Sequence, residues 1–232
     1  AVLNGVRERF ARGDAIVLLT PELDRIIWAN GPGAVLFGHE DVESAMDSDA
    51  GLAVQARRQI ASLSGYPRIG TDRAISLRLS HGATSRMVTL EAGQLRLPRG
   101  ELAIMLCQPA NRAAGQSANI AAAISGFFEA GYAAALVGAD GAMVATTGGF
   151  DELGLGRTAL RQLIDAVARK RDRLVKTLVE VDGGVLPIGF ARLTDDPAMH
   201  LLLTAQAPQP VEDETDVADD AVALATEIEK PL

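Results

Sequence analysis

Residues 15–38 read AIVLLTPELDRIIWANGPGAVLFG and decide the fold of the chain's first half. An apolar run at 15–19 is followed by a polar turn and by a second apolar run at 26–29. Two short apolar runs on either side of turn residues predict two neighbouring strands. Residues 133–145 repeat this order around Asp140-Gly141, a dipeptide typical of tight hairpins because glycine tolerates a positive φ. The sequence therefore predicts the same opening in both halves of the chain.

Each opening is followed by a helical segment and then by three further strands. The helices are predicted by apolar residues at steps of three and four: Leu52, Ala56, Ile60 and Leu63 in the first half, and Leu160, Leu163, Ile164 and Val167 in the second. Alternating or continuous apolar runs predict the strands, at 75–79, 88–92, 102–107, 174–181, 185–193 and 199–204. The expected fold class is α+β, with two tandem domains that each form an antiparallel five-stranded sheet with helices on one face.

Changes in composition along the chain suggest where the domains begin and end. We expect an N-terminal helix at 1–12, a first domain at 13–108, a linker and connecting helix at 109–124, a second domain at 125–207 and an acidic tail at 208–232.

Charge and composition exclude several classes of protein. The chain has 232 residues and a net charge of −8, but residues 208–232 alone contribute −7. A body with almost no net charge is a poor surface for nucleic acid. The apolar stretch at 120–145 contains Glu129 and Asp140, which argues against a membrane span. The single cysteine, Cys107, excludes an internal disulfide and fits a reducing compartment.

The residues around the first hairpin carry a family resemblance. Trp28-Ala29-Asn30 closes the second strand, and Leu36-Phe37-Gly38 follows closely. This order resembles the opening of a PAS domain, in which an asparagine often closes the second strand. In the second half Thr146-Thr147-Gly148 stands where that asparagine would be, so the resemblance there rests on the order of the elements.

Tandem PAS-like modules are similar to the sensory regions of bacterial histidine kinases, and here to the alphaproteobacterial cell-division control kinases of the PdhS and PleC type. The resemblance implies a non-catalytic, cytoplasmic region for sensing, protein interaction and dimerisation, on behalf of a kinase that controls cell division or development. The implied partners are a second copy of the chain and, through the parent kinase, response regulators or other signalling proteins.

An alternative function is that of a nucleotide-binding enzyme domain. Residues Gly154 to Ala159 match the pattern G-x-G-x-x-A before a helix, and Glu180 is a candidate ribose-binding acid. That fingerprint needs a strand leading into the first glycine and a parallel sheet around it, whereas residues 148–153 do not read as a strand. The two hypotheses therefore differ in whether the sheet is parallel or antiparallel.

No residue pattern indicates a cofactor, a metal site or a catalytic group. The three histidines are not at ligand spacing, and Cys107 ends an apolar strand, where a small core residue is expected. We therefore expect no catalytic residue and no tightly bound cofactor.

Two groups of apolar residues are candidates for binding. A ligand cavity between sheet and helices, or simply a filled core, is predicted from Trp28, Phe37, Met87, Met105 and Phe190. The N-terminal helix has an apolar stripe that packs either on its own sheet or on the same helix of a second copy: Val2, Leu3, Val6 and Phe10.

The tail has a third apolar pattern. Val217, Ala221, Leu224 and Ile228 recur at steps of four, three and four, close to the spacing of a coiled-coil seam. We expect residues 216–229 to become a helical connector when they continue into a further domain and pair with their twin.

Overall fold

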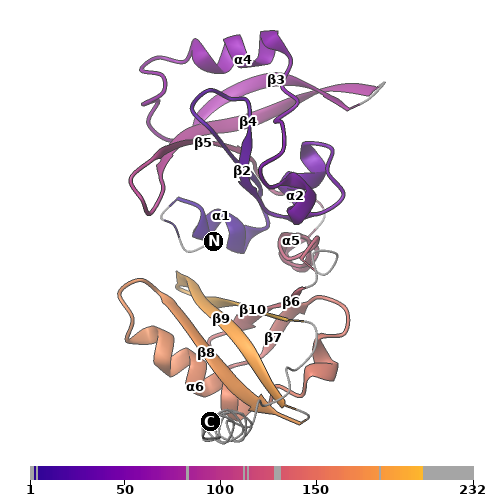
Figure 1. Cartoon of the computed structure of the whole chain (residues 1–232), viewed down its shortest axis with the longest axis vertical. Helices are drawn as coiled ribbons and strands as arrows, with labels where there is room; N and C mark the ends of the chain where they lie inside the picture. The colour runs from indigo at the N-terminus through magenta and orange to yellow at the C-terminus, as the bar shows by residue number, and fades with distance from the viewer. Residues whose placement is uncertain are drawn as a thin grey trace, which may run out of the picture.

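The computed structural model describes residues 3, 5–81, 84–111, 113, 115–127, 132–182 and 184–205. They form two five-stranded sheets, stacked along the long axis of the molecule (Figure 1). The strand orders are β2-β1-β5-β4-β3 and β7-β6-β10-β9-β8, so both halves have the same topology. Every pairing between these strands is antiparallel, and the expected fold class of two tandem PAS-like domains is confirmed.

The elements follow the order that the apolar patterns predict. The first sheet contains β1 (Ala15–Leu19), β2 (Ile26–Ala29), β3 (Arg73–His81), β4 (Thr84–Arg96) and β5 (Leu102–Gln108). The second contains β6 (Tyr132–Gly138), β7 (Met143–Thr146), β8 (Leu174–Val181), β9 (Gly184–Asp195) and β10 (Ala198–Ala205). The helices are α1 (Arg7–Arg12), α2 (Gly31–Leu36), α3 (Val42–Ala45), α4 (Val54–Ala61), α5 (Gln116–Ala123), the 3₁₀ turn η2 (Phe150–Leu153) and α6 (Arg157–Ala168).

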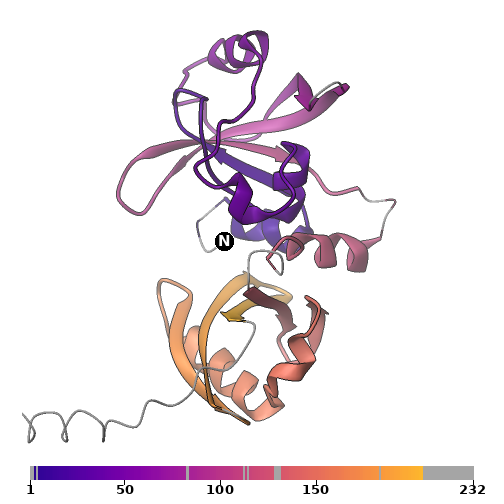
Figure 2. The same ribbon diagram turned by 45° about the vertical axis from the view of Figure 1, so that its right-hand side comes forward.

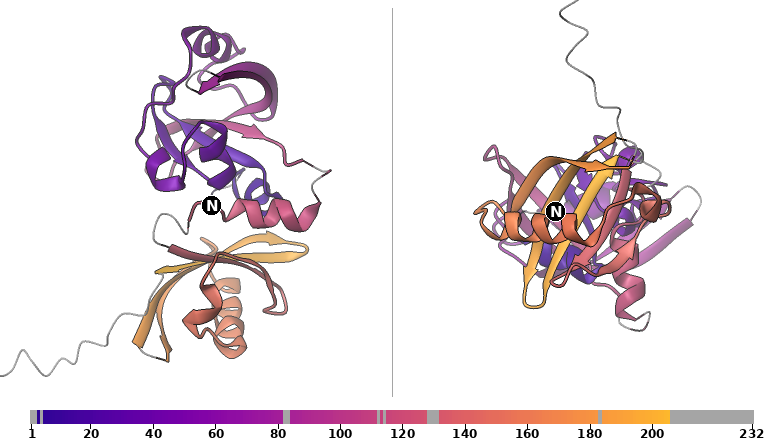
Figure 3. Two further views of the ribbon diagram at one scale, coloured as in Figure 1. Left: turned by 90° about the vertical axis from the view of Figure 1, so that its right-hand side faces the viewer. Right: turned by 90° about the horizontal axis from the view of Figure 1, so that it is seen from below.

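Each sheet buries one face against its own helices. In the first domain Val17, Leu90 and Leu106 alternate with residues of the opposite face and pack with Ala56 and Ile60 of α4. In the second domain Leu160, Leu163 and Val167 of α6 pack on the sheet, which Figure 3 shows from below, with α6 lying across the strands. The spacing of the apolar residues predicts both helices, and both are present in the structure.

Different residues tie the second strand of each domain to the first, at the ends of β2 and β7. The amide of Asn30 accepts from the N–H of Ile16 at 2.8 Å and from the N–H of Gly33 at 3.0 Å, so it ties β2 to β1 and caps α2. In the second domain the hydroxyl of Thr147 accepts from the N–H of Ala134 at 2.9 Å. A threonine thus closes the second hairpin where an asparagine closes the first.

The face of each sheet that is not covered by its own helices meets a shared layer. Helices α1 and α5 lie between the two sheets, α5 on one side of the layer and α1 on the other (Figures 1 and 2). The left view of Figure 3 shows α5 directly above the strands of the second sheet, with α6 on the opposite side of that sheet. The molecule is therefore layered, with helices between the two sheets as well as outside them.

Among the described residues, no helix combines the length and the apolarity that crossing a membrane requires.

The buried His200 predicts a pH dependence of stability. Its ring stacks on Phe190 with centroids 5.2 Å apart, and Nδ1 lies 3.3 Å from the carbonyl oxygen of Val137. Burial lowers the pKa of His200 below its usual value near 6.5. The folded protein therefore keeps the ring neutral while the unfolded chain takes up a proton, so stability is full above about pH 6.5 and falls as the pH drops below it.

The measurement is the free energy of unfolding in urea between pH 7.5 and 5. His200→Leu removes the titrating group and is expected to flatten the loss of stability over this range. An unchanged slope in the variant would show that other groups cause it.

Candidate functional site at the interdomain junction

A third hydrophobic cluster joins the two domains. Helix α1 contributes Val6 and Phe10, which are 1% and 0% exposed. Other buried members come from β1, β5, α5 with the turn after it, and the outer face of the second sheet, and α3 and β4 contribute one residue each. Among them are Ile16, Leu18, Met105, Ile120, Ile124, Phe127, Leu136, Ala191, Leu193 and Leu201. Because this core contains residues of both sheets, a displacement of one sheet changes the packing of the other.

Phe10 makes two aromatic contacts in this cluster. Its ring centroid is 6.3 Å from that of Trp28 on β2 and 6.5 Å from that of Phe127, just after α5. These are distances at which tilted aromatic pairs contact each other. The side chain therefore links the first sheet to the segment that leads into the second.

Glycines allow α5 to approach the first domain closely. A Cβ placed on Gly31 of α2 would lie 1.9 Å from the carbonyl oxygen of Ser125, and a Cβ on Gly13 would lie 2.1 Å from that of Asn119. Backbone atoms cannot yield as the end of a flexible side chain can. A side chain at Gly13 must therefore push α5 away, and one at Gly31 must push away the turn that follows α5.

We expect Gly31→Ala to destabilise the protein by about 1–3 kcal/mol, the usual cost of overpacking. Gly148→Ala is the matched control, because a Cβ at Gly148 meets nothing within 4 Å. Urea unfolding measures both variants. Equal stability of the two would mean that α2 and α5 are not in close contact.

A buried ionic cluster fixes α1 to the first sheet. The guanidinium of Arg9 lies 2.7 Å from Glu91 on β4 and 3.7 Å from Asp14, measured from Nη1, and its Nη2 pairs with Asp72. The carboxylate of Asp14 also accepts from the N–H of Ala110 at 2.9 Å. Arg9 therefore connects α1, β4 and the loop before β3, while Asp14 connects the same cluster to the segment after β5.

Cys107 belongs to this cluster as a neutral group. Arg9 Nη1 donates to its sulfur at 3.0 Å, and the thiol lies 3.7 Å from Asp14 Oδ2. Burial raises the pKa of Cys107 to about 12, although the Arg9 charge opposes the shift. The thiol is therefore protonated at neutral pH and is a weak nucleophile.

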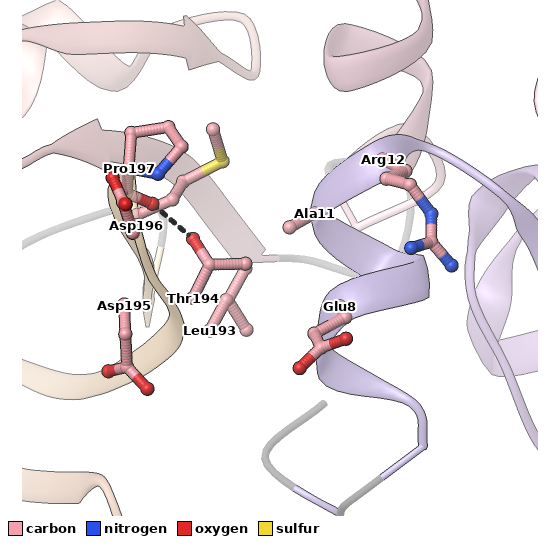
Figure 4. Close-up of a pocket in the computed structure, with 9 residues that line it drawn as sticks. Glu8, Ala11, Arg12, Leu193, Thr194, Asp195, Asp196 and Pro197 are labelled. Atoms are coloured by element: carbon pink, nitrogen blue, oxygen red, sulfur yellow. Dashed lines mark hydrogen bonds between the residues drawn. The ribbon is translucent and has the colours of Figure 1, made fainter.

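A cavity of about 420 Å³ opens between α1 and the β9–β10 hairpin (Figure 4). Glu8, Ala11 and Arg12 line it from α1, and residues 193–197 with Met199 line it from the hairpin. The hairpin is held in shape by Thr194, whose hydroxyl donates to the carbonyl oxygen of Pro197 at 2.6 Å, the dashed line in Figure 4. The junction is thus lined by both domains, and its opening changes if the domains move relative to each other.

Two arginine side chains pair with Asp195 in the wall of this cavity. Arg173 donates to Asp195 through both terminal nitrogens, with Nη1 at 3.2 Å, and Arg192 Nη2 lies 2.9 Å away. The hydrogen bonds from Arg173 lower the pKa of Asp195. This carboxylate is therefore ionised at neutral pH and already paired.

The five residues predicted to line a ligand cavity do not converge on one. Trp28 and Met105 belong to the junction, whereas Phe37 is in the core on the opposite face of the first sheet. Met87 is 59% exposed, and Phe190 is buried in the second domain. These residues are divided between the two domains and between the two faces of the first sheet, so the cavity hypothesis does not describe this structure.

The N-terminal stripe is covered by the chain itself. Val6 and Phe10 are buried, and Leu3 packs partly against the same cluster, while Val2 lies outside the described residues. Val6 and Phe10 are therefore not available for contact with a second copy, because α1 already packs between the two domains.

The nucleotide-binding alternative is wrong. Gly154 follows the 3₁₀ turn η2 rather than a strand, and Gly156 precedes α6 without a parallel strand beside it. Glu180 lies on β8, which pairs antiparallel with β9. The parallel sheet that this function needs is absent from the described part of the chain.

Sequence reasoning missed the ionic cluster at the junction. One signal was present: Arg9 lies three residues after Val6, hence on the same helical face as the apolar stripe. Its partners Asp72 and Glu91 are more than sixty residues away. Only the folded arrangement of the strands identifies them.

Comparisons with known proteins give one strong similarity in sequence. No protein-family model matches the chain. The cell-division control histidine kinase PdhS of Brucella canis is 37% identical over 232 residues, which is 98% of this chain and 22% of the relative. PdhS of Brucella ovis is 37% identical with the same coverage. The chain thus spans about a fifth of the length of the curated relatives it matches.

Similar solved structures are distant. The bacteriophytochrome RpBphP3 from R. palustris is 12% identical, with a TM-score of 0.31, and the match covers 91% of this chain and 56% of that one. The chromophore-binding domain of phytochrome P1 from Stigmatella aurantiaca is 12% identical, with a TM-score of 0.30 and 95% coverage of both chains.

The repeated strand order and the helices of each domain define the chain as a tandem pair of PAS-like domains. Over nearly all of its length it is similar to a segment of PdhS, a cell-division control histidine kinase. The resemblance to kinases of this type, which the tandem order of PAS-like modules indicates, is confirmed.

Proposed function

We propose that this chain is the non-catalytic sensory and protein-interaction region of a histidine kinase that controls cell division. Its role is to receive a signal through one PAS-like domain, or through a partner bound to it, and to pass the change to the other domain. The similarity to PdhS along 98% of the chain supports the class of parent protein.

The shared core at the junction is the observation that carries the proposal. Phe10 contacts Trp28 of the first sheet and Phe127 beside α5, and the same cluster includes Leu136 and Leu201 of the second sheet. Two domains that moved independently would not keep a shared set of side chains buried between them. A continuous core instead lets a displacement of one sheet bias the position of the other.

Dimerisation is part of the proposal, with contacts in a different place from those first expected. Since α1 is covered within the chain, the remaining candidate is the apolar stripe at 217–228, which lies outside the described residues. Paired with its twin in the full kinase, this stripe would carry a shift of the second domain toward a following domain. The response regulators served by the parent kinase are its proposed partners.

The proposal is tested by deleting residues 1–205 from the full-length kinase. We expect autophosphorylation from ATP to continue while its regulation during the cell cycle is lost. If the truncated kinase is folded but cannot phosphorylate itself, this region has a catalytic role and the proposal is contradicted. Leu193→Glu, which introduces a charge at the junction, is expected to alter regulation in the same direction.

A further inference from the structure

The second sheet has an apolar groove on the face that meets the junction. Two rows of residues cross the strands there, as the pairing register shows. One row contains Lys176, Gly189, Leu203 and Ala134, and the next contains Leu178, Pro187, Ala205 and Tyr132. Most of these side chains line a groove of about 600 Å³.

The groove is hollow because one position in its floor has no side chain. Gly189 lies between Lys176 and Leu203, and a Cβ added to it would meet only an ordinary contact, 3.8 Å from the carbonyl oxygen of Leu203. Leu178 and Tyr132 at the sides are 64% and 48% exposed. Two large apolar side chains are thus exposed beside one hollow, where another apolar segment could cover them.

The groove continues the buried surface of the junction. The next row toward the first domain contains Leu174, Ala191, Leu201 and Leu136. Those residues belong to the interdomain cluster. The same sheet face is thus covered at one end and open at the other.

The chain leaves the second sheet at this open end. Strand β10 ends at Ala205, which itself lines the groove, and 27 further residues follow. We propose that the chain's own residues 217–228 dock in this groove as a helix, with Val217, Ala221, Leu224 and Ile228 against Leu178, Pro187, Leu203 and Tyr132. This inference does not rest on the proposed function.

Length supports this occupant. The groove crosses four strands, or about 14 Å at the usual spacing of about 4.8 Å. A helix from 217 to 228 rises about 17 Å at 1.5 Å per residue. Residues 206–216 span up to about 36 Å when extended, which is ample for the helix to fold back.

Charge supports it as well. Residues 208–232 contain eight acidic residues and one lysine. Lys176 lies exposed in the groove, and Glu180, two residues beyond Leu178 on the same face of β8, is also exposed. An acidic side chain that flanks the stripe can pair with Lys176, and added salt should weaken that contact.

A small groove favours a tethered segment over a separate molecule. Stable association of two proteins usually buries about 1,200–2,000 Å² in total, far more than this groove provides. A tethered helix is present at an effective concentration in the millimolar range, so it binds through a smaller surface. The same stripe cannot face the groove and a twin helix at once, so docking and pairing exclude each other.

The test is amide hydrogen exchange of residues 216–229 in the whole chain, compared with a free peptide of residues 208–232. Gly189→Val fills the hollow and Leu178→Lys places a charge at its side. Val54→Lys is the matched control, because Val54 on α4 is 66% exposed but far along the chain from the groove. Protection of β6 and β10 amides reports that each variant is folded.

We expect exchange in the whole chain to be at least tenfold slower than in the free peptide, at every protein concentration. Gly189→Val and Leu178→Lys should return it to the free-peptide rate, whereas Val54→Lys should not. Equal exchange in chain and peptide would overturn the proposal. Protection that persists in both groove variants, or that rises with protein concentration, would place the stripe against another surface or a second copy and would overturn it too.

Discussion

Phe10→Ala is expected to lower the free energy of unfolding by about 3–5 kcal/mol, the usual cost of truncating a buried phenylalanine. The side chain is fully buried between Trp28 and Phe127, so its removal leaves a cavity that neither sheet can fill. Because that cavity lies at the junction, the variant should also let the two domains unfold separately. Urea unfolding followed by Trp28 fluorescence and by circular dichroism would then give two different midpoints.

Phe150→Ala is the matched control for this experiment. Phe150 is equally buried, but it packs only within the second domain. We expect a comparable loss of stability. The midpoints from Trp28 fluorescence and from circular dichroism should not move apart in this variant. The assignment of Phe10 to a shared core fails if both variants change the two midpoints in the same way.

Arg9→Met is expected to destabilise the protein by about 3 kcal/mol, the lower end of the usual cost of breaking a buried ion pair, because the buried Asp14 loses one guanidinium and keeps that of Arg12 at 3.4 Å. The Asp14 side chain is 5% exposed, and Glu91 and Asp72 also pair with this guanidinium. Methionine keeps much of the apolar stem of arginine, so the loss reports the charge more than the packing.

A double-mutant cycle separates the two contributions. Asp14→Asn alone should destabilise the protein, while Arg9→Met combined with Asp14→Asn should cost less than the sum of the single changes. Residues that share one buried ionic cluster couple by about 0.5–3 kcal/mol. Strict additivity in urea unfolding would mean that the two groups stabilise the fold independently.

The elements within each domain could be predicted from local patterns. Alternating apolar residues identify the strands, and Asp140-Gly141 identifies a hairpin that the structure contains as β6 and β7. The helical steps of Leu160, Leu163 and Val167 identify α6. These features depend on neighbours within about twenty residues, so the sequence carries them directly.

The junction could not be predicted in the same way. The stripe on α1 is compatible with packing on its own sheet or on a second copy, and periodicity cannot choose between them. The choice depends on Gly13 and Gly31, whose missing side chains let α5 come close enough to complete the layer. Such close approaches join residues about a hundred positions apart and leave no periodic signal.

The candidate cavity failed for a reason that strand register explains. Leu18 of β1 pairs with both Trp28 and Met105, so all three share one face of the sheet. Phe37 follows α2 on the other face. Grouping the large apolar residues by type, without fixing the register of the strands, placed both faces in one cavity.

Native-state amide exchange in increasing urea tests the shared core most directly. The slowest amides of β5 and β10 belong to different domains, but both strands contribute to the interdomain cluster. If the two domains share one core, these amides should converge on the same free energy of opening and the same dependence on urea. Distinct free energies and slopes for β5 and β10 would show that the domains open independently, and would contradict the account.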